Sequence, residues 1–396
     1  MCKPLGWVHA HSRARAASSA VGAPVRVALT KGTLLVPPTY FALAHAAAMP
    51  DLSWQAFTLA ARVRDPRIVV PIREASPGAL SSSRAIRLFS QARGLGAMRR
   101  AITRWEPEVI HQHQATWSLP AVGAARDTGA PLVVTVHGAD AYGRLGRGPG
   151  AAWNDLNRRA AFGGAHRLLA VSRYLADVAL ASGAQRRRLR VHYQGVDTAW
   201  WHPGAGASGQ GAGGAPGVPI VLFVGALSHL KGVDDLVEAS VRLHGTHPHS
   251  LVLVGEGPLY STLVSRAPTH VRVTGQLGRE EVRDWMRRSH VLVLPTKPTR
   301  GRAEAAGLVL LEAQACGVPA LAYATGGTPE MVAPGASVLT PGRTSAHLAR
   351  ALGEALTWGD AERAERGLAC RRWVEENRSL ATSADQLRAV YREVSR

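Results

Sequence analysis

The chain has 396 residues, of which 46% are hydrophobic, and this is enough apolar material for two domains with separate cores. No stretch approaches the ~20 apolar residues of a membrane-spanning helix, and the N-terminus lacks an uninterrupted apolar signal core. Three scattered cysteines without metal-ligand spacing fit a reducing compartment, so we expect a cytoplasmic protein.

The formal net charge of +19 is concentrated in the first half of the chain. Residues 1–200 hold 26 Lys and Arg against 10 Asp and Glu, whereas residues 201–396 hold 21 against 18. Such a half is attracted to polyanions, which include the inner face of an anionic membrane, an anionic lipid acceptor and nucleic acid. The alternative is an arginine-rich composition without a function, although composition alone would not spare the second half.

A repeated order of strand and helix predicts the first domain, at 24–200. Residues 1–23 precede it as a basic extension without acids, which we expect to be poorly ordered. The predicted strands are Val25–Leu29, Gln55–Leu59, Ile68–Ile72, Val109–His113, Leu132–His137 and Arg167–Ser172. This alternation indicates a parallel sheet covered by helices on both faces.

Residues 84–105 are predicted to form a basic amphipathic helix, because apolar residues recur every three to four positions. Its arginines are Arg84, Arg87, Arg93, Arg99, Arg100 and Arg104. A helix of this kind either lies on an anionic membrane or packs on a core with a solvated basic face, and the pattern leaves both open.

A linker and a second domain follow. Residues 202–218 are almost wholly Gly, Ala, Ser and Pro, which predicts a flexible linker at 201–218. Strands then resume at Ile220–Val224, Ser250–Val254, Val271–Gly275, Val291–Pro295 and Pro319–Tyr323, in a domain at 219–375. Residues 376–396 are predicted as a helix that returns to the first domain. Because ligands of open α/β sheets bind beyond the carboxyl ends of strands, we expect the site in the cleft between the domains.

Two carboxylates, Glu304 and Glu312, bracket the start of a helix predicted at Gly307–Cys316. The amides of Gly307 and Leu308 would be unpaired at this helix N-terminus, where the helix dipole favours a phosphate. A ligand on the helix axis would meet an anion site and two hydroxyl acceptors together. Nucleotide sugars have that shape.

Two further segments place polar groups after strands. One runs from Gly225-Ala226 to Lys231, where glycine lets a ligand approach and the lysine could neutralise a diphosphate; the segment alone is weak evidence and matches no Walker pattern. The other ends a strand at His137. This histidine either faces a cleft or, equally well, packs in the core or caps a helix.

The sequence favours a site without a metal or other cofactor. His111 and His113 share one face of a strand, but no third ligand stands near them. The chain also has no Asp-x-Asp, the kind of carboxylate cluster with which a transferase holds a divalent ion on its diphosphate.

Taken together, these segments resemble glycosyltransferase family 4, retaining enzymes with the GT-B fold, in which two Rossmann-like domains face each other across a cleft. The most specific match is Glu304–Val332, with a Glu-x(7)-Glu element and a Gly-Gly-x-Pro-Glu turn at Gly326–Glu330. Supporting matches are Val134–Asp140, Ala170–Leu180, Gln194–Pro203, Val224–Ala239 and Val254–Leu263. The sequence around Glu304 looks most like the sequences of bacterial exopolysaccharide and cell-envelope transferases.

The resemblance implies a role for each candidate residue. Glu312 would hold the ribose hydroxyls, Glu304 would contact the transferred sugar, and His137 would line the sugar pocket near the reacting carbon. The catalytic set is then His137, Glu304 and Lys231, and the donor-binding set is Gly32, Gly225, Lys231, Gly307, Leu308 and Glu312, with Gly32 in a loop after the first strand.

Two departures from the family pattern stand out. Where the family usually has Gly-Arg, this chain has Gly225-Ala226, which removes one cation expected on the diphosphate. The usual glycine-rich first loop is also altered, to Lys31-Gly-Thr-Leu-Leu-Val-Pro-Pro38. Both changes put donor affinity in question.

The implied function is metal-independent transfer of a hexose from a nucleoside diphosphate sugar to a hydroxyl of a glycan or lipid-linked acceptor, in cell-envelope or exopolysaccharide synthesis. The basic first half would contact the membrane peripherally. Alternatives are a degenerate GT-B scaffold that binds polyanions, or a nucleotide-sugar epimerase. Nucleic acid is not an expected partner, since no aromatic-studded basic sheet or helix-turn-helix signature occurs.

Overall fold

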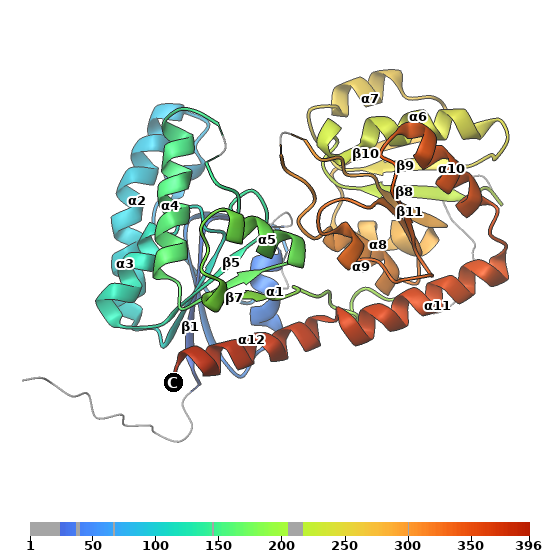
Figure 1. The fold of residues 1–396 in the computed structure, drawn as a ribbon. Coiled ribbons are helices and arrows are strands. Elements are labelled where there is room, and N and C mark those ends of the chain that lie inside the picture. Colours follow the sequence, from blue (N-terminus) through green and yellow to red (C-terminus); the bar gives the residue numbers. More distant parts are fainter. Residues whose placement is uncertain (1–23, 37–39, 66–67, 145, 205–216, 300) are drawn as a thin grey trace, which may run out of the picture.

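The computed structural model describes residues 24–36, 40–65, 68–144, 146–204, 217–299 and 301–396. The expectations for residues 1–23 and for most of the linker therefore lie outside the described residues. Two α/β domains stand side by side, and the last helices run beneath both of them (Figure 1). The α/β class predicted from the alternation of strands and helices is confirmed.

The N-terminal domain has a seven-stranded parallel sheet in the order β3-β2-β1-β4-β5-β6-β7. Its strands are β1 Arg26–Val36, β2 Ser53–Val63, β3 Ile72–Glu74, β4 Val109–His113, β5 Leu132–Val136, β6 Arg167–Ala170 and β7 Leu189–Val191. Its helices are α1 Phe41–Ala48, η1 Pro77–Leu80, α2 Arg84–Trp105, α3 Leu119–Thr128, α4 Pro149–Gly164, α5 Arg173–Ala181 and η2 Arg186–Arg188. Every residue of β4 and β5 is buried, as expected for central strands covered on both faces.

The C-terminal domain repeats this plan with six parallel strands in the order β10-β9-β8-β11-β12-β13. They are β8 Ile220–Val224, β9 Ser250–Val254, β10 Val271–Gly275, β11 Val291–Leu294, β12 Ala320–Tyr323 and β13 Val338–Thr340. Its helices are η3 His229–Lys231, α6 Val233–His244, α7 Tyr260–Arg266, α8 Arg279–Arg288, α9 Leu308–Ala315, η4 Thr328–Glu330 and α10 Ser345–Leu356.

The first strand corrects one prediction. The sequence suggested a strand that stops at Leu29 and a loop that carries Gly32, whereas β1 continues to Val36 and pairs with β2 along its length. The indole of Trp117 lies against Gly32, where a Cβ would come within 2.6 Å of the ring. Glycine at this position therefore makes room for a side chain inside a strand.

Smaller differences concern short strands at the edges of the sheets. The strand predicted at Ile68–Ile72 is instead β3, at Ile72–Glu74. The edge strands β7 and β13 were not predicted; each has only three residues, too few to show a period.

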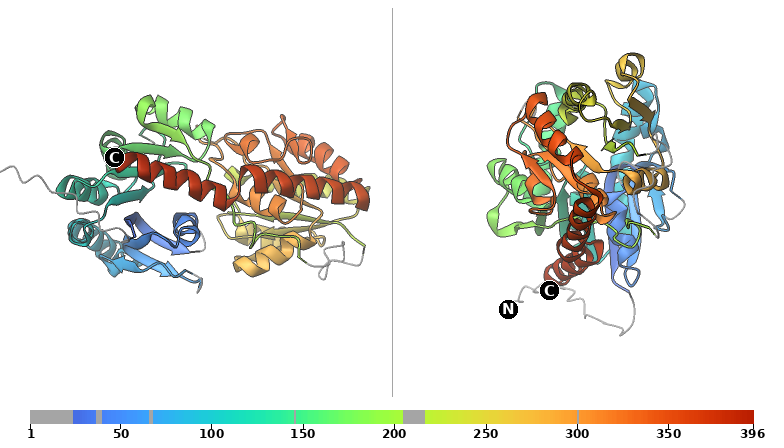
Figure 2. Two further views of the ribbon diagram at one scale, coloured as in Figure 1. Left: turned by 90° about the horizontal axis from the view of Figure 1, so that it is seen from below. Right: turned by 90° about the vertical axis from the view of Figure 1, so that its right-hand side faces the viewer.

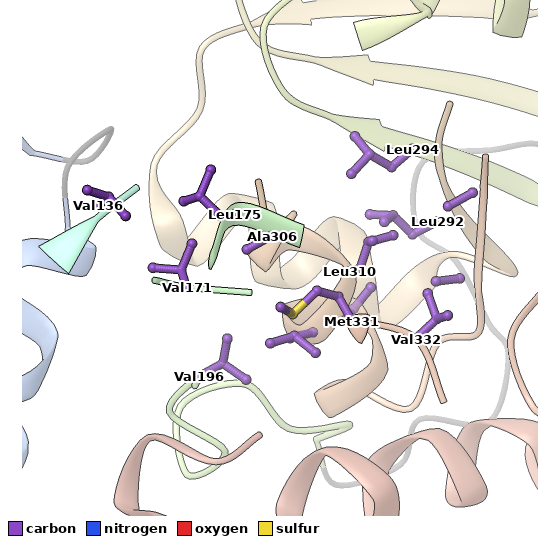
Figure 3. Close-up of a cluster of buried hydrophobic side chains, with 14 of the residues drawn as sticks. Val136, Val171, Leu175, Val196, Leu292, Leu294, Ala306, Leu310, Met331 and Val332 are labelled. Carbon is purple, nitrogen blue, oxygen red and sulfur yellow. The ribbon is translucent and has the colours of Figure 1, made fainter. Parts of the chain in front are cut away.

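An apolar core continues from one domain into the other. Figure 3 shows Val136, Val171 and Leu175 of the N-terminal domain facing Ala306, Leu310 and Met331 of the C-terminal domain. All of these side chains belong to one buried cluster. The two domains are thus held together by burial of apolar surface as well as by polar contacts.

The polar contacts between the domains centre on the Gly-Gly-x-Pro-Glu turn. The carboxylate of Glu330 accepts hydrogen bonds from the amides of Arg173 and Tyr174, at 2.9 and 3.1 Å, and so caps α5 across the domain boundary. A Cβ on Gly327 would lie 2.2 Å from a carbonyl oxygen, that of Ala305, so the close approach requires glycine.

The C-terminal segment consists of two helices, α11 Asp360–Asn377 and α12 Leu380–Val394. Seen from below in Figure 2, α11 lies along the C-terminal domain and α12 along the N-terminal domain. Tyr391 of α12 hydrogen-bonds through its hydroxyl to His111 Nδ1 at 2.6 Å. Arg388 reaches Asp51 at 2.7 Å, and Ser383 Oγ lies 2.8 Å from Nε2 of His45.

The contacts of α12 are part of a buried histidine cluster beneath the cleft. Its members are His45, His111, His113, His137 and His192. Burial, and for the first four the repulsion between neighbouring cations, lowers the pKa of every one of them below the ordinary value of 6.5. The folded protein therefore keeps these rings neutral.

Stability should decrease in mild acid. Below about pH 6.5 the unfolded chain protonates its histidines while the folded chain does not, so the unfolded state holds more protons and the free energy of unfolding falls as pH falls. The raised pKa values of Glu312 and Asp140 act in the opposite direction, but through two groups against five. Thermal unfolding followed between about pH 5.5 and 8 measures this slope.

The matched variants are His111→Gln, which removes one buried histidine, and His347→Gln at an exposed position. The first should lower the pH slope by about 1.4 kcal/mol per pH unit, and the second should leave it unchanged. A melting temperature that stays level down to pH 5.5 would contradict the neutral state of the cluster.

Candidate functional site

The N-terminus of α9 points into the region between the domains. Its N-cap, Gly307, has φ +75°, a left-handed conformation that glycine adopts without strain, and the helix begins at Leu308. Within the described part of the chain, the amides of Gly307 and Leu308 make no hydrogen bond. These two amides and the helix dipole together form a site for an anion.

The structure brings Lys231 and Glu304 together in front of this helix end. Lys231 Nζ lies 2.5 Å from a carboxylate oxygen of Glu304, and the same oxygen accepts a hydrogen bond from Thr296 Oγ1 at 2.8 Å. The Glu304 side chain is only 11% exposed, so these two partners take the place of water around its carboxylate.

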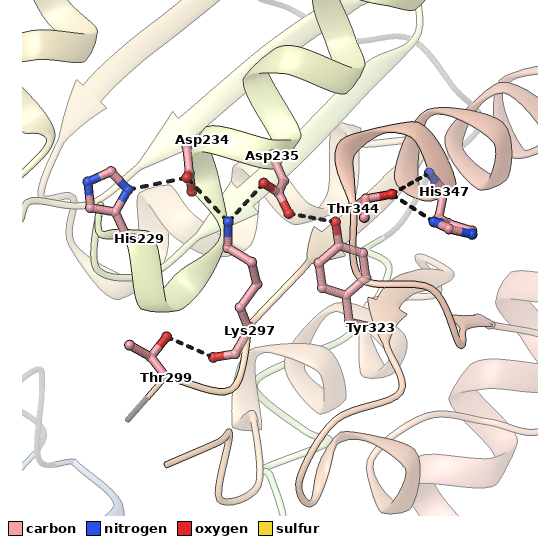
Figure 4. A network of polar contacts seen from close by, with 8 residues as sticks. All are labelled: His229, Asp234, Asp235, Lys297, Thr299, Tyr323, Thr344 and His347. Carbon is pink, nitrogen blue, oxygen red and sulfur yellow. Dashed lines mark hydrogen bonds and ion pairs between the residues drawn. The ribbon is translucent and has the colours of Figure 1, made fainter. Parts of the chain in front are cut away.

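Lys231 is held in place by the turn that follows it and by an ion-pair network. The turn residue, Gly232, has φ +67°, and a Cβ there would meet the Pro295 carbonyl oxygen at 2.0 Å. Lys297 bridges Asp234 and Asp235, which both lie in the first turn of α6, at 3.3 and 2.8 Å (Figure 4). These contacts fix the start of α6 and therefore the position of Lys231.

Glu312 lies one helical turn inside α9 and borders a cavity of about 430 Å³. Burial raises the pKa of this carboxyl group to about 7, an effect that the positive charge of Arg279 reduces. The cavity is lined at the carboxyl ends of β8, β9 and β10 by Val224, Gly225, Ala226, Val254, Gly255, Glu256, Gln276 and Leu277. Gly225 thus lines the same cavity as Glu312.

A neighbouring cavity of about 200 Å³ extends toward the N-terminal domain. It shares Tyr40, Trp201, Arg279 and Glu312 with the larger cavity and adds Leu308 at the helix end. The guanidinium of Arg279 lies 3.7 Å above the ring of Tyr40. The two cavities therefore form a continuous site to which both domains contribute.

Arg279 and Tyr40 were missed by the sequence reasoning. Arg279 is the first residue of α8, directly after the loop that follows β10, and a cation in that position is a signal that could have been used. Its guanidinium shares the larger cavity with Ala226, the position where the resemblance predicts a missing cation. Tyr40 carries no comparable signal.

His137 follows β5 and lies at the top of the histidine cluster. Its Nε2 is 3.1 Å from His113 Nδ1, and its ring centroid is 4.3 Å from that of Phe41, which lines the smaller cavity. Its Nδ1 is buried and makes no hydrogen bond of ordinary geometry with the described residues, while the Gln194 side chain interacts with the ring. Burial lowers the pKa of His137 well below 6.5, so the ring is neutral. Neither cavity is lined by His137 itself.

Asp140 positions the backbone of His137. Its carboxylate accepts hydrogen bonds from the amides of His137, Gly138 and Ala115, at 3.0, 2.8 and 2.9 Å. These bonds join the loop after β5 to the loop after β4. Two residues of that second loop, Gln114 and Trp117, have φ of +68° and +64°, which is strained for residues other than glycine.

Lys31 and Gly32 lie apart from the two cavities. Lys31 is 4% exposed, and its Nζ donates to Gln114 Oε1 and to the Thr33 carbonyl at 2.9 and 3.0 Å. Burial lowers the pKa of Lys31 to about 8. Since the expected loop is a strand, the role of Gly32 at a donor phosphate is not supported by its location in the structure.

No three or more histidine, cysteine or acidic side chains of the described residues are grouped to hold a metal ion. His111 and His113 instead bond to Tyr391, Thr135 and His137. None of the helices in the described ranges combines the length and the apolar composition needed to cross a bilayer.

Family models match both domains. The model described as "Glycosyltransferase Family 4" matches residues 41–200, and the model described as "Glycosyl transferases group 1" matches residues 218–357. Their boundary falls in the segment between β7 and β8.

Curated relatives agree with these matches. The chain is 31% identical to a glycogen synthase of Mycobacterium tuberculosis over 242 residues, which cover 58% of this chain and 55% of that protein. It is 33% identical to a D-inositol 3-phosphate glycosyltransferase of Acidothermus cellulolyticus over 296 residues, which cover 66% and 63%. The match thus spans little more than half the length of the first of these relatives.

Solved structures share the architecture over 93% of the chain. A sucrose-phosphate synthase from Thermosynechococcus elongatus superposes with a TM-score of 0.76 at 21% identity, over 93% of this chain and 99% of that one. Anabaena HepE in complex with UDP and glucose gives a TM-score of 0.72 at 16% identity, over 93% and 100%. At such identities the likeness establishes the fold.

The two parallel sheets, the cavity between them and the matches of both domains lead to one conclusion: the chain has the GT-B fold and belongs to glycosyltransferase family 4.

Proposed function

We propose that the protein transfers a hexose from a nucleoside diphosphate sugar to a hydroxyl group, with the anomeric configuration retained. The observation that carries this proposal is the convergence at one helix end of the Lys231–Glu304 pair, the free amides of Gly307 and Leu308, and the carboxyl group of Glu312. The Lys231–Glu304 pair would meet the sugar of such a donor, the two amides its diphosphate, and Glu312 its ribose.

The donor would lie along the axis of α9. Glu312 borders both cavities and accepts hydrogen bonds from ribose hydroxyls, while the base occupies the larger cavity beside Gly225 and Leu277. The diphosphate meets the amides at the helix end and Lys231. Glu304 then exchanges its bond with Lys231 for a hydroxyl of the transferred sugar.

The reaction separates charge, and the site is built to stabilise it. The bond between the anomeric carbon and the diphosphate breaks, and its electron pair passes to the phosphate oxygen. The acceptor hydroxyl oxygen bonds to that carbon on the same face, and its proton passes to the departing phosphate oxygen. Lys231 and the amides of Gly307 and Leu308 stabilise the negative charge that develops there.

We propose that Lys231 and these amides stabilise the diphosphate in place of a divalent metal. Arg279, which pairs with Asp65 at 3.7 Å, lines the cavity that contains Ala226, and it would partly offset the absence of the arginine that the resemblance predicts after Gly225. We propose that the neutral ring of His137 lies close to the transferred sugar, behind Phe41, which lines the smaller cavity.

For the acceptor, we propose a glycan or a lipid-linked sugar of the cell envelope or an exopolysaccharide. The support is the charge of the first half of the chain, which contributes the acceptor side of the cleft and is attracted to anionic molecules and membranes. We place the reaction on the cytoplasmic face of a membrane for the same reason.

The donor site can be tested by the replacement Glu312→Ala. Loss of a carboxylate that accepts hydrogen bonds should raise the dissociation constant of the donor about 10- to 100-fold, in line with ~1.5–3 kcal/mol for a charged hydrogen bond. Thermal stabilisation by UDP-, GDP- and ADP-sugars identifies the donor and measures the loss. Glu354→Ala, at an exposed position of α10, is the control.

The chemical step can be tested by Lys231→Ala. Because the lysine stabilises charge that develops only as the bond breaks, we expect kcat to fall about 10²- to 10³-fold while donor affinity changes much less. Transfer to an added acceptor under saturating donor gives kcat. Isomerisation of the donor without an acceptor, or an unaltered kcat in this variant, would contradict the assigned role.

The pKa of Glu312 predicts a pH dependence. The carboxylate form, which accepts ribose hydroxyls best, dominates above about pH 7, so kcat/KM for the donor should decline as pH falls through 7. In Glu312→Gln the side chain no longer ionises, and the decline near pH 7 should disappear. If the acid limb persists in this variant, another group is responsible.

A further inference from the structure

Helix α2 has two different surfaces. It lies on the side of the N-terminal domain farthest from the C-terminal domain (Figure 1). Its inward surface packs: Met98 and Ile102 are buried, and Gly94 allows close contact with Leu59 and Ser76. The periodicity of the sequence left open a packed helix or a membrane-bound one, and the inward surface accounts for only part of its apolar residues.

The outward surface begins with two exposed apolar side chains. Ile86 is 54% and Phe89 63% exposed, although η1 lies against one side of Ile86 at Gly78. The guanidinium of Arg93 lies 5.4 Å from the Phe89 ring, on the same side of the helix. Leaving two such side chains in water forfeits the free energy gained when apolar surface is removed from solvent, and this favours a partner.

Arginines continue the same surface toward the end of the helix. Arg93, Arg100 and Arg104 follow one another at spacings of seven and four, so they lie in one row. All three are exposed and form no ion pair with any described residue. Arg99, on a different side of the helix, is neutralised by Asp127 at 2.5 Å.

The topology places the apolar end of this surface on the cleft side of the sheet. Helix α2 follows β3 and η1, so its first turns lie at the edge where the parallel strands end. His137, which follows β5, lies at that same edge. Ile86 and Phe89 therefore lie at the level of the strand ends that carry the cleft loops, on the side of the domain away from the C-terminal domain.

We propose that the outward surface of α2, formed by Ile86, Phe89, Arg93, Arg100 and Arg104, docks the protein on an anionic lipid membrane. Ile86 and Phe89 enter the interfacial region, and the arginines contact lipid headgroups. The aliphatic side chain of Ile86 favours a membrane over nucleic acid, since it can neither pair with phosphate nor stack on a base.

Docking requires no transferase activity, but its benefit rests on the proposed function: a bound enzyme would hold its cleft near a lipid-linked acceptor. The two can fail separately. Donor binding is measured without vesicles, and vesicle binding is measured without donor.

The test is sedimentation of the full chain with vesicles. We expect it to bind vesicles with roughly one-third phosphatidylglycerol, more weakly as salt rises, and not to bind pure phosphatidylcholine. The triple variant Arg93→Ser, Arg100→Ser, Arg104→Ser should bind on the order of 100-fold more weakly, because each arginine near an anionic surface contributes about fivefold. The double variant Ile86→Ser, Phe89→Ser should also bind more weakly but keep its salt dependence.

Matched controls lie on the C-terminal domain. Leu368→Ser removes an apolar side chain that is also 63% exposed, and Arg266→Ser, Arg350→Ser, Arg372→Ser removes the same net charge. Both controls should bind like the parent chain, and all variants should keep their stabilisation by nucleotide sugar.

Three outcomes would overturn the proposal. In the first, the parent chain binds neutral and anionic vesicles equally. In the second, the C-terminal control variants lose as much vesicle binding as the α2 variants. In the third, the double variant keeps its vesicle binding while the triple variant loses binding to single-stranded RNA. The last result would make the surface a general polyanion site.

Discussion

The capping of α5 by Glu330 across the domain boundary is the contact on which the cleft depends. One carboxylate serves two successive amides of the N-terminal domain and the Tyr193 hydroxyl, while its own residue lies in the turn after β12. Because Gly327 donates its amide to the Glu304 carbonyl, the same turn also fixes the residue proposed to meet the sugar. The spacing of the domains and the position of Glu304 are therefore set by one short segment.

The charges in the cleft are balanced against each other rather than against water. Glu304 is stabilised by Lys231 and Thr296, and removal of the lysine leaves a nearly buried carboxylate with one hydroxyl as its partner. Glu312 has no such partner at bonding distance among the described residues, and burial raises its pKa. A donor that supplies hydroxyls to both acids and a diphosphate to the lysine would satisfy all three groups at once.

The sequence predicted elements whose signals are local. The strand and helix alternation and the N-terminus of α9 follow from periodicity and glycine placement, and the structure has them within a few residues. The extension of β1 through Gly32 could not be predicted, because it depends on the Trp117 ring, which lies far away in the chain. Arg279 and Tyr40 were missed for the same reason: they meet only when the two domains come together.

Helix α2 shows where periodicity reaches its limit. A spacing of three to four residues states that a helix has an apolar side, but Met98 and Phe89 fit that spacing equally well, and only one of them is buried. What separates them is the side of the helix on which they lie: Met98 lies on the side that packs against β2, whereas Phe89 lies on the outward side, although η1 contacts the first turns near Ser90. An apolar residue that periodicity assigns to a core but the fold leaves in water thus becomes informative, because the folding of this chain does not account for it.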